Sequence, residues 1–438
     1  MGDLAAFEAK KAARGRLFGF ELLPAPYVVA HLQLGLLLQK LGAPLDEKIG
    51  ERAAIYLTNA LTGWSPTRDP KQLVLQELQA EREAANKVKQ EQRILVILGN
   101  PPYDGFAGLA MAEERDLGGA YREVHTPGCP APQGQGLNDL YVRFYRMAER
   151  QIVEKTGEGI VCYISNYSWL DGLSHPGMRE RFLEAFDAIT IDCLNGDKFK
   201  TGKLTPEGQP DPSVFSTEAN REGIQVGTAI AMLVRRPLSR QTSARAGNRK
   251  KGDKTSSAHL AQAELRFRHF WGKQKRKELL GALIEENVNY QRLSPVRELG
   301  LAFVPLRVVP GFTGWPALPD LFPFTSSGVN TSRDQDLIDI DRAKLEQRIR
   351  IYFDANVPID AQKAITPSLV AHSKNFDPIG TRKRLLALGF ASGRLQSYAY
   401  RPFDNRWVYW HSETNLLDRK REELQGQISD GNNFAIQS

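Results

Sequence analysis

The segment at residues 237–258 constrains the organisation of this chain more than any other stretch. Its sequence, PLSRQTSARAGNRKKGDKTSSA, contains six basic residues, one acid and a single large aliphatic side chain, Leu238. Such a segment cannot bury enough apolar surface to offset the entropy lost on ordering, so it predicts a flexible surface linker. Two interpretations of its charge stay open: a solvated basic loop, or an arm that contacts phosphates. On either interpretation it separates residues 1–236 from residues 259–438.

Length and composition exclude several classes of protein. The chain has 438 residues, which favours two or three domains. Its 41% hydrophobic and 25% charged residues are ordinary for a globular protein and exclude a wholly disordered or fibrous one. The formal net charge of +7 permits a nucleic-acid partner without proving one. No run of about 18 apolar residues predicts a membrane span, and the first residues lack the apolar core of a signal peptide, so we expect a cytoplasmic protein.

The sequence predicts neither disulfides nor a metal site. Cys129, Cys162 and Cys193 are too few and too scattered for a disulfide framework or a zinc site. The seven histidines are dispersed, with no H-E-x-x-H pair. We therefore expect reduced cysteines and no bound metal.

Strand-like and helix-like segments alternate before the linker. Short apolar runs predict strands at residues 16–21, 53–58, 93–99, 159–165, 188–194 and 226–234. Helical spacing and end signals predict helices at residues 24–42, 72–92, 137–157 and near 177–187. Continuous apolar strands between helices indicate an open α/β sheet covered on both faces, whose ligands bind beyond the carboxyl ends of the strands. Residues 259–438 mix aromatic, basic, proline-rich and helical segments, and predict a separate α+β module.

The tetrapeptide Asn100-Pro101-Pro102-Tyr103 directly follows the strongly apolar strand at residues 93–99. An exocyclic aromatic amine such as N6 of adenine is a poor nucleophile because its lone pair is delocalised into the ring. The side-chain oxygen of Asn100 and the carbonyl of Pro101 could accept its two N–H groups and free the lone pair to attack a methyl group. The prolines stiffen the backbone, and Tyr103 offers a ring for stacking an extruded base. The competing interpretation is a proline-stiffened turn with no chemistry.

In the strand at residues 93–99 and the tetrapeptide that follows it, the sequence resembles the S-adenosylmethionine-dependent DNA methyltransferases that modify N6 of adenine. The segment GFELLPAPYVVAHLQLGLLL resembles the family's second motif, which implies that Glu21 binds the cofactor ribose; the alternative is an ordinary exposed glutamate at the end of a strand. The segment IYLTNALTGW resembles the third motif, with Asn59 where the family usually has aspartate to meet the cofactor adenine. The fold class implied is an incomplete Rossmann-like methyltransferase sheet at residues 1–236, followed after the linker by an α+β target-recognition module at residues 259–438.

The resemblance extends to substrate contacts and is closest to single-polypeptide restriction–modification enzymes of the type I-like (ISP) kind. The segment at 196–236 is similar to the eighth motif, which implies that Phe215 flanks a flipped adenine; a core phenylalanine is the alternative. The segments SSGVNTSRD and YRPFDNRWVYW resemble the specificity region. They imply that Arg333, Arg401 and Arg406 contact double-stranded DNA, although salt bridges to nearby aspartates would explain them too.

The family's first motif, an F-x-G-x-G turn that cradles the cofactor, has no counterpart in the 20 residues before Glu21. No P-loop is present either, so these residues predict no helicase motor. We expect that the sequence is truncated at its amino-terminal side or that another polypeptide, such as the restriction and helicase subunit, supplies the missing part.

Two alternatives stay open beside DNA adenine methylation. One is a catalytically inactive DNA-binding remnant, which the missing cofactor turn favours. The other is an N-methyltransferase acting on RNA or protein, because those enzymes share the Asn-Pro-Pro-Tyr loop. Cytosine-C5 transfer is excluded, since it needs a thiolate after proline, whereas Cys129 precedes Pro130.

Overall fold

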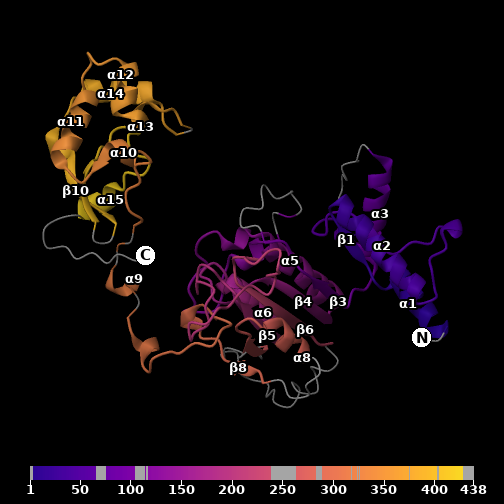
Figure 1. Ribbon diagram of the computed structural model, residues 1–438. Helices are drawn as coiled ribbons and strands as arrows, with labels where there is room; N and C mark the ends of the chain where they lie inside the picture. Colours follow the sequence, from indigo (N-terminus) through magenta and orange to yellow (C-terminus); the bar gives the residue numbers. More distant parts are fainter. Residues whose placement is uncertain are drawn as a thin grey trace, which may run out of the picture. The chain divides into compact units, whose positions relative to one another are not determined.

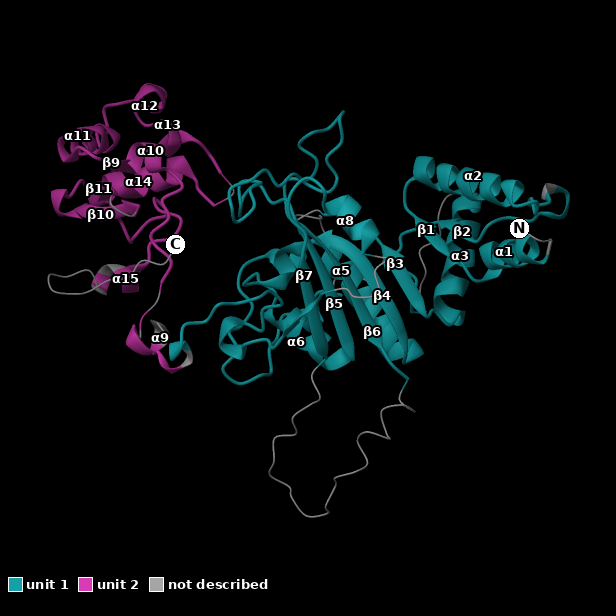
Figure 2. Cartoon of the chain, turned by 60° about the horizontal axis from the view of Figure 1, so that its bottom comes forward, with its two compact units in different colours: residues 1–313 teal, residues 314–438 magenta. Residues whose placement is uncertain are grey.

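Two compact units make up the chain, Met1–Thr313 and Gly314–Ser438 (Figure 2). The structure is a computed structural model, and the residues it describes are 3–65, 75–103, 114, 117–237, 263–282, 289–316, 318–322, 324, 326–373, 375–401 and 404–427. The predicted linker at 237–258 lies outside the described residues except for Pro237. No described helix is long and apolar enough to cross a membrane.

A six-stranded mixed sheet forms the centre of the first unit (Figures 1 and 2). In order across the sheet its strands are β3 (Val96–Gly99), β4 (Gly159–Asn166), β6 (Thr228–Arg235), β5 (Ala188–Asn195), β7 (Glu264–His269) and β8 (Gln291–Leu293). Strands β3, β4, β5 and β7 run in one direction, whereas β6 and β8 run in the other. The carboxyl ends of four strands therefore meet at one edge of the sheet, which we call the carboxyl edge.

One face of this sheet packs against α5 (Leu140–Glu149) and α6 (Pro176–Ala185). The ring of Phe182 on α6 lies 5.5 Å from that of Tyr145 on α5 and 5.6 Å from that of Trp169. These rings bury a large apolar area against the strands, and edge-to-face and tilted pairs add to its stability. A π-helical segment, Arg150–Thr156, continues α5 to the left-handed Gly157 that leads into β4.

The opposite face of the sheet is less covered than the face that packs against α5 and α6. Burial alternates along β4 and β6: Val161 and Leu233 are fully buried or nearly so, whereas Met232 is 38% exposed. Alternation is typical of a sheet packed on one face. Among the described residues the second face is therefore covered less than the first. Ile160, Cys162 and Ile164 on that face are only partly exposed, so cover on both faces stays a prediction.

A smaller layer precedes the large sheet in the same unit. Strands β1 (Gly19–Glu21) and β2 (Ile55–Leu57) pair in parallel, and three helices accompany them: α1 (Asp3–Gly15), α2 (Pro24–Lys40) and α3 (Gln76–Glu91). Proline in the first turn of α2 suits a helix start. Lys89 of α3 is fully buried and donates to the carbonyls of Asn59 and Thr62, which fixes the chain after β2 against α3.

The second unit has its own core and a three-stranded antiparallel sheet. Its strands, in the order β10-β11-β9, are β10 (Leu395–Arg401), β11 (Asp404–Tyr409) and β9 (Ile338–Asp339). The helices are α10 (Asp334–Leu337), α11 (Arg342–Tyr352), α12 (Ile359–Ile365), α13 (Pro367–Val370), α14 (Pro378–Leu388) and α15 (Glu422–Gln427). Asp341 caps α11 through the amides of Ala343 and Lys344, as aspartate at this position commonly does.

Short helical segments complete the described elements. They are η1 (Glu47–Ile49), η2 (Gly119–Tyr121), η3 (Gly136–Asn138), η5 (Tyr167–Leu170), α8 (Lys275–Gly281), η7 (Arg297–Leu299), η8 (Phe312–Gly314), α9 (Leu318–Leu321) and η9 (Ser392–Arg394).

Every strand and helix predicted before the linker is present within a few residues of its expected bounds. The division of the chain differs from the prediction. The predicted downstream module begins at residue 259, yet residues 264–269 form β7, which pairs in parallel with β5 from Ala188↔Glu264 to Cys193↔His269. The first unit therefore extends to Thr313. A basic, aromatic strand such as ELRFRH gives no sign in sequence that it pairs across the linker.

We predict that Phe182→Ala destabilises the first unit by about 3–5 kcal/mol, because its ring is fully buried between α5, Trp169 and Phe186 and truncation leaves a cavity. Denaturant unfolding followed by circular dichroism measures the change. Phe7→Ala is the control, since that ring is 60% exposed on α1 and its loss should change stability by less than about 0.5 kcal/mol. Equal stability of the two variants would contradict this packing.

Candidate functional site

Several polar segments meet at the carboxyl edge of the six-stranded sheet. Asn100 follows β3, Tyr167 follows β4, and residues 196–227 form one long loop, here called the edge loop, that connects the end of β5 to the start of β6. The amide of Tyr167 donates to the carbonyl of Gly227, 3.0 Å away, and so joins the segment after β4 to the end of the edge loop. Ligands of open α/β sheets bind at this kind of edge.

The Asn100-Pro101-Pro102-Tyr103 corner stands at this edge directly after β3. Asn100 is exposed, Pro101 is buried and Tyr103 is partly exposed. The Tyr103 hydroxyl donates to the side-chain oxygen of Asn100 at 2.9 Å and lies 3.3 Å from the carbonyl of Ile164 on β4. Burial raises the pKa of the Tyr103 phenol well above its ordinary value, so the group stays a neutral donor. The ring is thus fixed over the end of β4, beside an accessible amide.

Two buried aspartates hold the edge loop in place. Asp197 accepts the amides of Phe199 and Lys200 through one carboxylate oxygen and the amide of Gly227 through the other, at 2.6–2.8 Å. It therefore ties the beginning of the loop to its end. Carboxylates that accept several backbone amides in this way are strongly held.

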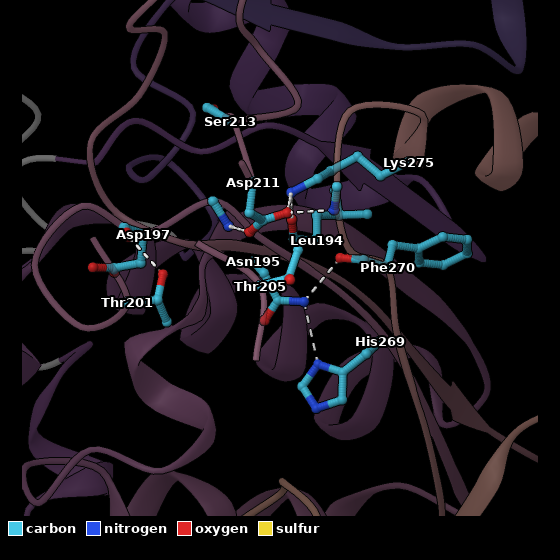
Figure 3. A network of polar contacts seen from close by, with 12 residues as sticks. Leu194, Asn195, Asp197, Thr201, Thr205, Asp211, Ser213, His269, Phe270 and Lys275 are labelled. Carbon is cyan, nitrogen blue, oxygen red and sulfur yellow. Dashed lines mark hydrogen bonds and ion pairs between the residues drawn. The ribbon is translucent and has the colours of Figure 1, made fainter. Parts of the chain in front are cut away.

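Asp211 forms the second anchor, together with Lys275 (Figure 3). Its carboxylate accepts the amides of Gly196 and Gly272, each at 2.7 Å, and pairs with the Lys275 ammonium at 2.7 Å. Lys275 also donates to the carbonyl of Leu194 at 2.6 Å. Both side chains are almost completely buried, and burial lowers the pKa of Lys275 while the Asp211 carboxylate opposes that change. The pair joins the edge loop to the ends of β5 and β7.

Asn195, the last residue of β5, completes this network with a left-handed backbone at φ 50°. Its amide nitrogen donates to the carbonyl of Phe270 at 2.9 Å and lies 3.2 Å from Nδ1 of His269 (Figure 3). Asparagine tolerates this conformation better than most residues, which explains the Asn-Gly turn here.

Phe215, predicted to flank a flipped base, lies on the edge loop two residues after the buried Ser213 and is partly exposed. Its amide donates to the Ser213 hydroxyl at 3.3 Å. The structure thus places Phe215 and the Asn100–Tyr103 corner at the same edge of one sheet, and their role toward a base stays a prediction.

The two predicted cofactor residues differ in their surroundings. Glu21 ends β1, is partly exposed and uses one carboxylate oxygen to accept the amide of Leu23 at 2.9 Å. Asn59 is engaged within the protein, because its amide nitrogen donates to Glu114 at 2.7 Å and its oxygen accepts the amide of Leu61 at 2.8 Å. Glu21 therefore presents a second oxygen for a ligand, whereas the amide of Asn59 is already committed.

The three arginines predicted to contact DNA differ in their exposure and in their partners. Arg333 is 4% exposed, donates to the carbonyls of Thr331 and Leu416 and to Asp418, and its guanidinium lies 3.6 Å from the ring centre of Phe376. This position supports the second unit from inside and leaves no exposed face for phosphate.

Arg401 and Arg406 remain near the surface of β10 and β11. The guanidinium of Arg401 lies 5.2 Å from the ring centre of Tyr400, and that of Arg406 lies 4.3 Å from it. The Tyr400 hydroxyl donates to Asp334 at 3.0 Å. Arg406 also forms a forked ion pair with Asp404, the salt bridge considered as the alternative from sequence. Arg401 is exposed and is the better placed of the two for a phosphate.

Sequence reasoning missed Asp197, Asp211 and Lys275. The Asn-Gly-Asp turn at residues 195–197 was a visible signal, because such a turn after an apolar strand marks an irregular, hydrogen-bonded loop. The pairing of Asp211 with Lys275 could not be found, since the predicted linker separates them in sequence. Among the described residues no group of three histidine, cysteine, aspartate or glutamate side chains could hold a metal ion.

Residues 320–438 match the family model described as the Type ISP C-terminal specificity domain. Most of the second unit is thus similar to a Type ISP specificity domain. No curated protein matches the chain. The match of residues 320–438 to the family model confirms the predicted relation to Type ISP restriction–modification enzymes for the specificity region.

Three solved structures resemble the chain in fold. The DrdV–DNA complex determined by cryo-electron microscopy has a TM-score of 0.58 and 19% identity, over 95% of this chain and 39% of that one. The ATP-dependent Type ISP restriction–modification enzyme LlaBIII bound to DNA has a TM-score of 0.57 and 18% identity, over 94% and 26%. A nuclease-deletion mutant of the Type ISP enzyme LlaGI with a DNA substrate mimic has a TM-score of 0.58 and 15% identity, over 96% and 34%. The chain therefore spans well under half the length of these relatives.

We predict that Arg333→Ala lowers the free energy of unfolding of the second unit by about 2–3 kcal/mol, because it removes a buried guanidinium bonded to two carbonyls and a carboxylate. Arg401→Ala is the matched control and should change stability by less than about 0.5 kcal/mol, since Arg401 is exposed. Urea unfolding of both variants measures the difference. A stable Arg333→Ala variant would show that this arginine is dispensable to the core.

Proposed function

We propose that this chain is part of a site-specific DNA methyltransferase of a restriction–modification system, which transfers a methyl group to N6 of a flipped adenine. The observation that supports it most strongly is the position of Asn100-Pro101-Pro102-Tyr103: an accessible amide and an aromatic ring at the carboxyl edge of an α/β sheet.

The corner would act on the adenine amine through fixed acceptors. The Asn100 oxygen, which accepts the Tyr103 hydroxyl, has a second lone pair for one N–H of the amine, and the Pro101 carbonyl would accept the other. Both oxygens would draw the nitrogen toward tetrahedral geometry and localise its lone pair. The Tyr103 ring would stack on the extruded base. No covalent enzyme intermediate is needed, because orientation and fixed dipoles suffice.

The cofactor of this reaction would be S-adenosylmethionine, which supplies the methyl group when bound. Glu21 fits a ribose-binding role, since it ends β1 with one carboxylate oxygen bonded to Leu23 and the other available. Asn59 fits less well, because Glu114 and Leu61 already occupy its amide. We therefore retain Glu21 as the cofactor contact and assign Asn59 to holding the loop after β2.

We further propose that a segment outside these 438 residues contributes the missing cofactor turn, together with a strand that pairs with β3. Among the described residues β3 pairs only with β4, and Val96 and Leu98 on it are 53% and 72% exposed. Helix α2 is apolar, yet Leu32 and Leu36 are 56% and 50% exposed. An apolar edge strand and an exposed apolar helix face are features that proteins normally cover. A restriction and helicase polypeptide is the proposed source.

Double-stranded DNA is the proposed partner. All three structural relatives described above are complexes with DNA or a DNA mimic, and residues 320–438 match the model of a Type ISP specificity domain. Arg401 beside Tyr400 supplies an exposed cation next to an aromatic ring, a combination suited to nucleic acid. Competition between duplex DNA and RNA at fixed salt tests this choice against an RNA methyltransferase, and a glutamine-containing peptide substrate tests a protein methyltransferase.

A catalytically inactive DNA-binding remnant is the second candidate, and the lack of an F-x-G-x-G turn in the residues before Glu21 favours it. Calorimetry with S-adenosylmethionine separates the two. Binding by the chain alone, or after addition of a polypeptide that carries the cofactor turn, supports the enzyme. Duplex DNA binding without cofactor binding in either state supports the remnant.

We predict that Asn100→Ala abolishes methyl transfer in the complete enzyme while DNA affinity changes by less than a few fold, because the exposed amide acts on the amine and is not a packing residue. Transfer of a labelled methyl group to duplex DNA measures it. Asn100→Asp, which replaces the amide by a carboxylate with acceptor oxygens, is the control and should retain part of the activity. Full turnover of Asn100→Ala would refute the mechanism.

Tyr103 permits a test of stacking separate from hydrogen bonding. Tyr103→Phe removes the bonds to Asn100 and Ile164 but keeps the ring, whereas Tyr103→Ala removes both. We expect Tyr103→Ala to lose about 1–3 kcal/mol of binding to DNA with an extruded adenine, and Tyr103→Phe to lose much less. Fluorescence of 2-aminopurine at the target base measures the extruded state. Equal losses in both variants would show that the hydroxyl, and not the ring, matters.

A further inference from the structure

Phe199, on the edge loop, is the most exposed phenylalanine among the side chains that the structure describes, at 73%. Isolated exposed apolar residues are common on protein surfaces and by themselves indicate nothing. Phe199 differs from them because the backbone that carries it is fixed, and because it lies on the loop at the carboxyl edge, where the Asn100–Tyr103 corner also lies.

The turn at residues 197–200 is held on both of its sides. The Phe199 amide donates to Asp197 at 2.7 Å, and the other oxygen of Asp197 accepts the amide of Gly227 at the far end of the loop. Thr201 donates through its hydroxyl to the carbonyl of Asp197 at 2.8 Å (Figure 3). A ring on such a turn loses little further backbone entropy when it binds a partner.

The turn is also joined to the Asp211–Lys275 pair. The amide of Asp211 donates to the carbonyl of Lys203 at 2.7 Å, and the Asp211 carboxylate is bound by Lys275 and two glycine amides. The backbone that presents Phe199 is therefore connected to the ends of β5 and β7. Removing Lys275 would leave the Asp211 carboxylate buried without its counterion and loosen this connection.

Lysines flank Phe199 in the chain. Lys198 lies 3.6 Å from Glu222 and Lys200 lies 2.7 Å from Asp171, and all four side chains are 40–67% exposed. Exposed ion pairs of this kind are weak and screened by salt, so either ammonium can exchange its partner for a phosphate at small cost. An aromatic ring between two such lysines matches a base step between its phosphates.

We propose that Phe199 is a DNA-contacting residue that stacks on or inserts at a base step of duplex DNA docked on the carboxyl edge, with Lys198 and Lys200 against the adjoining phosphates. This inference rests on the proposed DNA partner. Asp211 and Lys275 act as positioning residues that hold the turn in place.

The test measures affinity of the full chain for a fluorescent duplex over a range of salt concentrations. Phe199→Ala should weaken binding roughly 5- to 150-fold at each salt concentration without changing the salt dependence, because stacking involves no ion release. Lys198→Gln or Lys200→Gln should lower the slope of log affinity against log salt by about 1. Phe7→Ala, which removes an exposed ring on α1, is the matched control and should bind as the wild type does.

Two further variants address geometry and position. Phe199→Trp should bind DNA about as tightly as the wild type, and the fluorescence of the introduced indole should be quenched by DNA if the ring stacks. Lys275→Met should weaken DNA binding and expose the edge loop to trypsin at Lys198, Lys200 and Lys203. Wild-type affinity of Lys275→Met, with the loop cleaved faster, would overturn the positioning role of Lys275.

The outcomes of these measurements are separable. Wild-type affinity in Phe199→Ala, in a chain that binds duplex DNA, would overturn this inference and leave the proposed function standing. No duplex binding by the wild-type chain at any salt concentration would overturn both. Weakened binding with an altered salt slope in Phe199→Ala would also overturn the inference, because the ring would then act through the lysines and not by stacking.

Discussion

The common direction of β3, β4, β5 and β7 is the constraint on which the candidate site depends. It brings residues that are far apart in sequence, from Asn100 to Lys275, to a single edge of the sheet. The aromatic packing of Tyr145, Trp169 and Phe182 beneath the strands keeps that edge rigid. Strands β5 and β6 are antiparallel neighbours that a short hairpin could join, so the topology of the sheet does not require the long edge loop between them.

Rigidity of the edge loop comes from buried polar groups and not from apolar packing. Asp211 and Lys275 are nearly inaccessible to water, and taking both charges out of solvent is costly unless their bonds are complete. Here the carboxylate has two amides and an ammonium, and the ammonium has a carbonyl as well. Such a pair contributes little net stability, and its contacts hold the edge loop against the ends of β5 and β7.

Apolar surface is exposed at the outer side of β3 and in the smaller layer formed by β1, β2 and α2. The free edge of β3, the two-stranded β1–β2 sheet and the exposed leucines of α2 are apolar surfaces without cover among the described residues. A parallel sheet of two strands is normally part of a larger one. The segment proposed to pair with β3 would complete this surface and bring the cofactor turn to the Asn100–Tyr103 corner.

The sequence by itself determined the order and bounds of the elements before the linker, because apolar periodicity and end signals such as the proline of α2 act locally. It also located the Asn100–Tyr103 corner, since a motif after an apolar strand needs no tertiary information. Only the tertiary structure decided that β7 belongs to the first sheet, that Arg333 is buried, and that Lys275 holds Asp211. It also decided that one sheet face is less covered than the other among the described residues. Each of these depends on contacts between residues distant in sequence, and the residue types alone do not show which distant residue each one contacts.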